Sequence, residues 1–127
     1  MGDGLGRKIF FWLLLIVYSM VIFIFSSQPE VGVEQYFYGQ DKVMHFFTYG
    51  IYAFLCLIAL SDKILIFKLF HYFLALSLSV SYGIFNEIYQ CFIPEREFSP
   101  GDILANSLGI ITFLILVYIF QNKKLKR

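Results

Sequence analysis

Four long stretches without an aspartate, glutamate, lysine or arginine dominate this sequence. They cover residues 9–26, 43–60, 69–86 and 103–120, and each holds 18 residues. As α-helices they would be about 27 Å long, close to the roughly 30 Å hydrocarbon core of a bilayer. Barrel strands would alternate polar and apolar side chains, which the run Phe10–Ile16 does not do. We therefore predict an all-α, polytopic membrane protein with a bundle of four transmembrane helices.

The composition supports this class and excludes several others. Of the 127 residues, 59% are hydrophobic and only 15% are charged, whereas soluble domains carry roughly 25% charged residues. A net charge of +1 offers no basic surface for nucleic acid, and two cysteines make no disulfide scaffold. The first stretch is longer than the apolar core of a signal peptide, so we expect an uncleaved helix. Residues 1–127 are expected to form a single membrane domain.

The lysines and arginines predict the orientation of the bundle. Eight of the ten would lie on the side of the two termini, and seven of the nine acids would lie on the opposite side. Because positive charge is concentrated on the cytoplasmic side of membrane proteins, we expect both termini in the cytoplasm. The expected location is a bacterial plasma membrane.

This topology brings polar residues from separate segments to the outer membrane boundary. They open the second span, close the third, and lie in the following loop and at the start of the fourth. The set is Asp41, His45, Glu87, Gln90, Arg96, Asp102 and Asn106. Polar residues kept within membrane segments are a functional hypothesis by default.

Helical spacing predicts that these groups face one another. Asp41 and His45 continue along one stripe of the second span to Cys56. On the third span, small residues at four-residue intervals lead to Glu87, and such residues allow close helix packing, so Glu87 should point into the bundle. On the fourth span, Asp102, Asn106 and Gly109 share a face. Cys56 would lie about 16 Å deeper than His45, too far from Cys91 for a disulfide.

Each polar residue also has a purely structural interpretation. Asp41 and Asp102 would stabilise helix N-termini, and His45 would make an interhelical hydrogen bond. Glu87 and Arg96 would form an ion pair. The loop from Cys91 to Gly101 is expected to fold over the site, ordered by a bond from Arg96 to one of the acids.

A series of sequence elements resembles the motifs of the VanZ-like family of small membrane proteins, named after an accessory protein of teicoplanin resistance. The elements are SSQP at 26–29, DKVMHFFTY at 41–49, YGIFNEIYQ at 82–90, PER at 94–96 and DILANSLG at 102–109. Asn86, Tyr89 and Glu95 depart from the family pattern, in which Asp, His and Gly are common. The resemblance implies a role in the cell envelope and in tolerance of glycopeptide antibiotics.

Our leading functional hypothesis is an outer pocket that binds or processes the headgroup of a membrane lipid or a lipid-linked cell-wall precursor. Arg96 would clamp phosphate or carboxylate, and the residues that would orient the ligand are Asp41, Gln90, Asp102 and Asn106. Aromatic residues near the loops would pack on the ligand or form an interfacial belt. They are Tyr36, Phe37, Tyr38, Phe92 and Phe98.

Four alternatives remain open from the sequence. In an enzyme, His45 and Glu87 would transfer protons and Arg96 would stabilise an anion, although no catalytic motif is present. A Mn²⁺ or Zn²⁺ site could use Asp41, His45, Glu87 and Asp102, but the pattern is weak and we expect no metal or other cofactor. A proton-coupled exporter would need its acid near the membrane midplane. An accessory subunit would use the polar layer only to join its helices.

Overall fold

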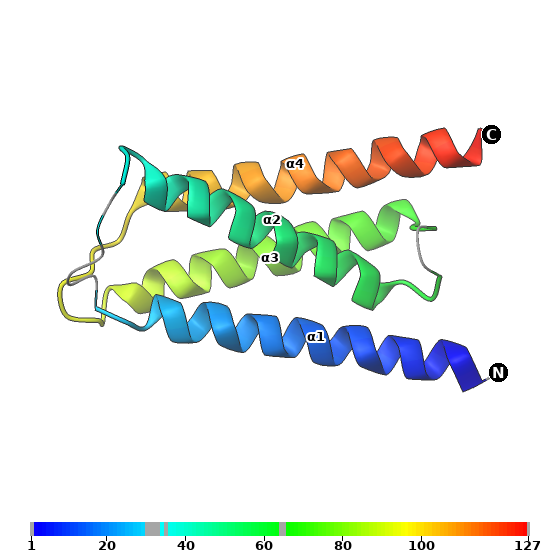
Figure 1. Ribbon diagram of the computed structural model, residues 1–127, viewed down its shortest axis with the longest axis horizontal. Helices are drawn as coiled ribbons and strands as arrows, with labels where there is room; N and C mark the ends of the chain where they lie inside the picture. The colour runs from blue at the N-terminus through cyan, green and yellow to red at the C-terminus, as the bar shows by residue number, and fades with distance from the viewer. Residues whose placement is uncertain (1, 30–33, 35, 64–65, 127) are drawn as a thin grey trace.

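The computed structural model describes residues 2–29, 34, 36–63 and 66–126, and its regular secondary structure within them is entirely helical. The four helices are α1 (Gly2–Ser26), α2 (Gln40–Leu60), α3 (Leu69–Gln90) and α4 (Pro100–Leu125). Successive helices run in opposite directions, so both termini lie at one end of the bundle (Figure 1). All four are long and apolar enough to cross a membrane. The predicted all-α, four-span membrane fold is confirmed.

The helices extend beyond the uncharged stretches by which they were predicted. α1 continues through Arg7 and Lys8, and α3 continues through Glu87 to Gln90. Charged side chains near a membrane boundary reach water, so they do not end a helix. α4 begins earlier than predicted because Ser99 caps it and Pro100 occupies its first turn.

The closest helix packing joins α2 to α4. A Cβ atom added at Gly109 would collide with the main-chain carbonyl group of Phe46, and one at Gly50 would collide with the ring of Phe113. These two glycines therefore permit the close approach of α2 and α4. α1 packs against α2 and α3 but makes no contact with α4 among the described residues.

The predicted inward faces are buried. On α3 the sequence Ala75, Ser79, Gly83 and Glu87 lies inside, with Glu87 only 1% exposed. Tyr49, Tyr52 and Cys56 of α2 are buried beside them, as are Asp102, Asn106 and Gly109 of α4. Most of the buried polar side chains consequently lie toward one end of the bundle, with Ser79 near its middle and Ser61 at the other end.

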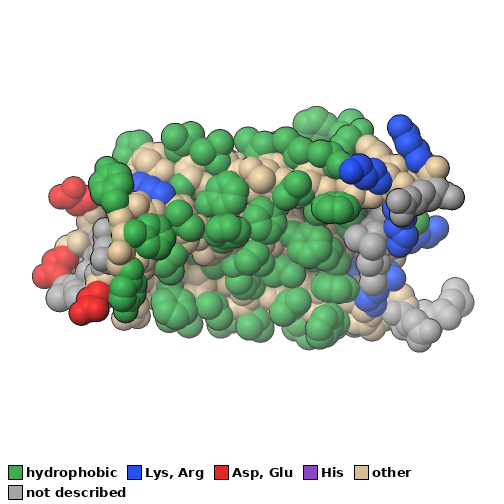
Figure 2. Space-filling model, turned by 45° about the horizontal axis from the view of Figure 1, so that its top comes forward, with side chains coloured by type: hydrophobic (Ala, Val, Ile, Leu, Met, Phe, Trp, Pro, Cys, Tyr) green, Lys and Arg blue, Asp and Glu red, His purple; other side chains and the backbone are tan. Residues whose placement is uncertain are grey.

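The surface has an apolar belt between two charged ends (Figure 2). We call the end that holds both termini and the α2–α3 connection the terminal end, and the opposite end the site end. The described basic residues of the terminal end are Arg7, Lys8, Lys63, Lys68, Lys123, Lys124 and Lys126. Lys42 and Arg96 are the described basic residues of the site end. Glu30 and Arg127, which contribute to the predicted charge asymmetry, lie outside the described residues.

Polar contacts also close the terminal end. Lys8 Nζ lies 2.7 Å from a carboxylate oxygen of Asp62, and this hydrogen bond lowers the pKa of the Asp62 carboxyl. The Gln121 amide bonds both main-chain groups of Phe67, with distances of 2.9 Å and 3.0 Å. α1 and α4 are thereby each tied to the α2–α3 connection.

Candidate functional site

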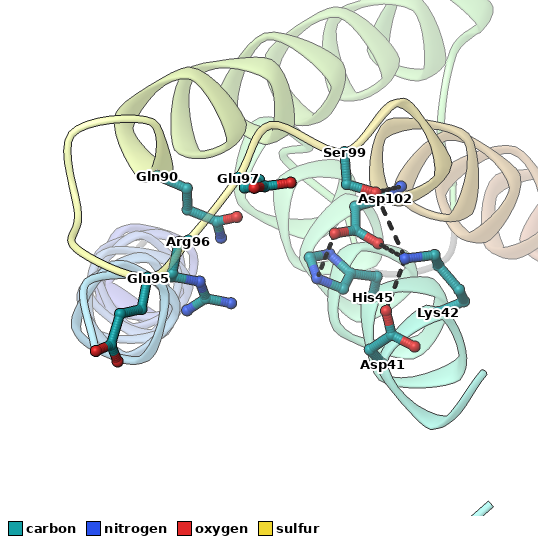
Figure 3. Close-up of a pocket in the computed structure, with 9 residues that line it drawn as sticks. All are labelled: Asp41, Lys42, His45, Gln90, Glu95, Arg96, Glu97, Ser99 and Asp102. Atoms are coloured by element: carbon teal, nitrogen blue, oxygen red, sulfur yellow. Dashed lines mark hydrogen bonds and ion pairs between the residues drawn. The ribbon is translucent and has the colours of Figure 1, made fainter. Parts of the chain in front are cut away.

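A polar pocket of about 460 Å³ opens at the site end of the bundle (Figure 3). Residues from α2, α3, the α3–α4 loop and α4 line it. They are Asp41, Lys42, His45, Gln90, Glu95, Arg96, Glu97, Ser99 and Asp102. The structure therefore brings together five of the seven residues proposed from the sequence, and Glu87 and Asn106 lie directly behind them.

Lys42 links the first turns of α2 and α4. Its ammonium lies 2.6 Å from a carboxylate oxygen of Asp41 and also donates to Asp102. A longer contact of 3.5 Å reaches the hydroxyl of Ser99. Both acids lie in the first turns of their helices, where the helix dipole also favours a negative charge.

His45 of α2 contacts the side chains of Asn106 and Asp102 of α4. Its Nδ1 atom lies 2.9 Å from Oδ1 of Asn106, and an amide oxygen is an acceptor, so this contact is a hydrogen bond from Nδ1–H. The other ring nitrogen, Nε2, lies 3.8 Å from Oδ2 of Asp102. The structural interpretation of His45 as an interhelical hydrogen-bonding residue is confirmed, and its second nitrogen still faces the pocket residues.

Glu87 orders the start of α4 instead of lining the pocket. Its carboxylate accepts a hydrogen bond of 2.8 Å from the main-chain N–H of Ser99. The hydroxyl of Ser99 in turn accepts from the N–H of Asp102 and caps α4. Glu87 therefore acts on the pocket through the position of Ser99 and Asp102.

The prediction that Arg96 bonds to an acidic side chain is wrong for the described residues. Nη1 of Arg96 instead donates to the main-chain carbonyl groups of Phe25, Ser26 and Gln28, over distances of 3.1–3.4 Å. α1 has no basic residue in its own last turn. Arg96 supplies the positive charge that favours a helix C-terminus, because carbonyl oxygens there lack helical partners.

Gln90 connects α3 to α1 beside Arg96. Its side-chain nitrogen donates to the hydroxyl of Ser26 at 2.8 Å, and the residue is only 4% exposed. Its oxygen makes no hydrogen bond to a described residue. Figure 3 shows the Gln90 amide and the Arg96 guanidinium on one side of the pocket, with His45 and Asp102 on the other side.

An apolar groove of about 470 Å³ adjoins the polar pocket. Its walls come from α1, the residues that follow α1, α2, the end of α3 and the α3–α4 loop. They include Tyr18, Val21, Ile22, Phe25, Met44 and Thr48. Four residues line both spaces: Asp41, His45, Gln90 and Arg96. The groove is thus continuous in its lining with the polar pocket and runs along the face of α1.

The alternative of a Mn²⁺ or Zn²⁺ site is contradicted for the part of the chain that the structure describes. No group of three or more His, Cys, Asp or Glu side chains there could hold a metal ion. Lys42 bridges Asp41 and Asp102, and Glu87 is bonded to Ser99. The carboxylates that would have been metal ligands are therefore already paired with the Lys42 ammonium group or with the main-chain N–H of Ser99.

The aromatic residues near the loops line neither space. Tyr36, Phe37, Tyr38, Phe92 and Phe98 are all exposed. Their positions agree with an interfacial belt and not with a wall of the pocket. Cys56 is buried and Cys91 is exposed, and both are free thiols, as the predicted difference in depth requires.

Four residues that line the pocket were missed by the sequence analysis: Lys42, Glu95, Glu97 and Ser99. Ser99 could have been found, because a serine before a proline with an acid three residues later is typical of a helix N-terminus. Lys42 lies within a quoted sequence element, but a lysine beside an aspartate gives no sign that it reaches across to α4.

Comparisons with known proteins give no match: no family model, no curated protein and no solved structure matches this chain.

Proposed function

We propose that this multi-pass membrane protein binds an amphiphilic lipid, with the headgroup in the polar pocket and a hydrocarbon chain along the apolar groove. The observation that carries the proposal is the set of residues lining both spaces, namely Asp41, His45, Gln90 and Arg96. A molecule that is polar at one end and apolar at the other matches such a pair of spaces. Ligand sites commonly combine apolar walls with a few polar groups that fix orientation.

The position of the polar groups supports a lipid over a water-soluble ligand. Val21, Met44 and Phe25 line the groove and are at least 41% exposed on the apolar belt, so a chain can enter sideways from the bilayer. The polar pocket lies at the site end, where a headgroup would be. No rearrangement of the bundle is required for a lipid to occupy both.

Binding accounts for the site better than catalysis or proton-coupled export. Glu87, the acid on which both alternatives depend, is committed to Ser99 and does not line the pocket. It is also near the end of α3 and not at its middle, where alternating access would need it. A role in binding and orienting a ligand is compatible with the positions that the pocket residues have in the structure.

The charge distribution favours the outer face of a bacterial plasma membrane for this site, because the terminal end carries most of the basic residues. The resemblance to VanZ-like proteins adds a role in the cell envelope, with a phospholipid or a lipid-linked wall precursor as the ligand. Glycopeptide tolerance would then follow from occupancy of the site.

Native mass spectrometry after gentle extraction tests the proposal. The wild-type protein should retain a lipid, whereas Val21→Trp should lose it because the larger side chain fills the groove. Val17→Trp is the matched control: Val17 is one turn away on α1, is 56% exposed, and does not line the groove. Equal lipid retention by both variants, or no retained lipid in the wild type, would overturn the proposal.

A phenotype provides a second test. If a host strain gains glycopeptide tolerance from this protein, Arg96→Ala and Glu87→Gln should abolish that tolerance while the proteins still insert in the membrane. Full tolerance with both variants would separate the phenotype from this site.

A further inference from the structure

We infer that the bound lipid is a zwitterionic phospholipid whose headgroup ends in a primary ammonium group. This inference rests on the proposed lipid-binding function and specifies its ligand. It follows from which hydrogen-bonding groups of the pocket are already used and which still face its interior.

The basic residues of the pocket are largely committed to the protein itself. Lys42 donates to Asp41, Asp102 and Ser99, which uses the three protons of its ammonium. Nη1 of Arg96 donates to the carbonyl groups at the end of α1. The remaining edge of the Arg96 guanidinium is the one cationic group available to a ligand within the described pocket.

The interior of the pocket is otherwise lined by acceptors. Oδ2 of Asp102 lies 3.8 Å from Nε2 of His45, and this carboxylate oxygen can accept a hydrogen bond. The oxygen of Gln90 makes no hydrogen bond to a described residue, and it is an accessible atom of the pocket lining that can accept one from a ligand. The Glu97 carboxylate adds a negative charge at the same rim.

The Gln90 oxygen and the carboxylates of the pocket can all accept hydrogen bonds from a ligand. A primary ammonium provides three donors and a positive charge, which matches several acceptors and an excess of carboxylates. A headgroup with a second phosphate, or one that ends in an uncharged glycerol, would leave the excess negative charge of these carboxylates without a counter-charge. The pocket chemistry therefore selects an ammonium over an anionic headgroup.

The order of groups along the site matches the order of groups in such a lipid. The apolar groove would take the hydrocarbon chain. Arg96 lines both spaces and would bind the phosphate at their junction. Glu97 and Asp102 line only the polar pocket, beyond that junction, and would accept from the ammonium.

Binding of three phospholipids with identical acyl chains tests the inference. Delipidated full-length protein is titrated with phosphatidylethanolamine, phosphatidylcholine and phosphatidylglycerol, and bound lipid is counted by native mass spectrometry. Phosphatidylcholine has the same net charge as phosphatidylethanolamine but no N–H donor. We expect phosphatidylethanolamine to bind about tenfold more tightly than either, the effect of one charge-assisted hydrogen bond.

Two glutamates provide matched variants. Glu97→Gln should remove most of the preference for phosphatidylethanolamine, while Glu34→Gln should leave it unchanged, because Glu34 lines neither the polar pocket nor the groove. Both side chains are exposed, so neither change should unfold the protein. Equal effects of the two variants would overturn the inference.

The outcomes separate this inference from the proposed function. Equal binding of all three lipids, blocked by Val21→Trp, would overturn the ammonium preference and leave lipid binding intact. Displacement of phosphatidylethanolamine by a lower concentration of a polyprenyl-linked wall precursor would overturn the assignment to a phospholipid. No binding of any of these lipids would overturn the proposed function itself.

Discussion

Lys42 holds the first turns of α2 and α4 together by pairing with two carboxylates. The side chain of Asp102 is only 13% exposed, whereas that of Lys42 is 41% exposed. Solvent weakens such a pair from the lysine side, but an unpaired Asp102 would remain a poorly hydrated charge. The pair therefore stabilises the fold mainly because its loss would leave Asp102 charged and unpaired. The attraction between the two side chains contributes less.

We expect Lys42→Met to lower the free energy of unfolding by about 1–2 kcal/mol, because Asp41 and Asp102 would lose their shared counter-charge. Thermal unfolding of the purified protein in detergent measures the change. Lys63→Met is the control, since Lys63 is exposed at the terminal end. An unchanged unfolding temperature for Lys42→Met would show that the pair contributes nothing.

Glu95 has a backbone conformation that favours glycine, with a φ angle of 65°. Replacing it with glycine relieves a steric cost of about 1 kcal/mol, partly offset by the greater freedom of the unfolded chain. Glu95→Gly should therefore raise the unfolding temperature. Glu97→Gly, at a position without a positive φ, should lower it slightly. The opposite order would contradict the conformation of this loop.

The convergence of the site residues could be predicted because it follows from topology. Once four spans are placed, Asp41, Gln90 and Asp102 must lie at the same end. The partners of each side chain could not be predicted in the same way. Arg96 bonds to carbonyl groups about 70 residues away in the chain, and nothing in its local sequence distinguishes those from a carboxylate.

Among the helices, α2 and α4 are the most closely packed pair and α1 is the peripheral helix. Gly109 lies so close to the main chain of Phe46 that no side chain fits between them. α1, by contrast, is tied to the others at the site end by Arg96 and Gln90. The apolar groove lies along this peripheral helix.

Gly109→Ala should destabilise the protein by about 1–3 kcal/mol, because the added methyl group forces α2 and α4 apart. Gly6→Ala is the matched control, since a Cβ atom there meets nothing within 4 Å. Alanine also favours a helix over glycine, so this control should be neutral or stabilising. Equal unfolding temperatures for the two variants would contradict the close packing.

The sequence predicted the number and location of the helices, because the absence of charge over 18 residues is a strong constraint. It did not predict their ends, since charged residues near the boundary remain helical. The contact of Gln121 with Phe67 could not be predicted from the sequence either, because a single polar residue near a helix end does not specify a partner 54 positions away.

The molecule as a whole has one basic end, one acidic end and an apolar belt between them. From this asymmetry the positive-inside rule predicts that the terminal end lies in the cytoplasm. In that orientation the polar pocket would face outward and the groove would open toward the outer leaflet. The site would then have access to lipids and precursors of that leaflet.

Cysteine labelling tests this orientation. Cys91 is exposed at the site end and Cys56 is 1% exposed, so a membrane-impermeant maleimide should label intact cells, and Cys91→Ser should abolish the signal. In the Cys91→Ser background, Lys124→Cys at the terminal end should react only after the membrane is permeabilised. The reverse pattern would place the pocket in the cytoplasm.

The most direct test of lipid binding is the location of covalent cross-links. Phosphatidylethanolamine carrying a photoreactive group in its acyl chain is incorporated with the protein into nanodiscs, irradiated, and mapped by peptide mass spectrometry. We expect cross-links concentrated on Val21, Phe25 and Met44 of the groove, and their loss in Val21→Trp but not in Val17→Trp. Cross-links spread evenly over the apolar belt, unchanged by Val21→Trp, would contradict a lipid-binding site at this position.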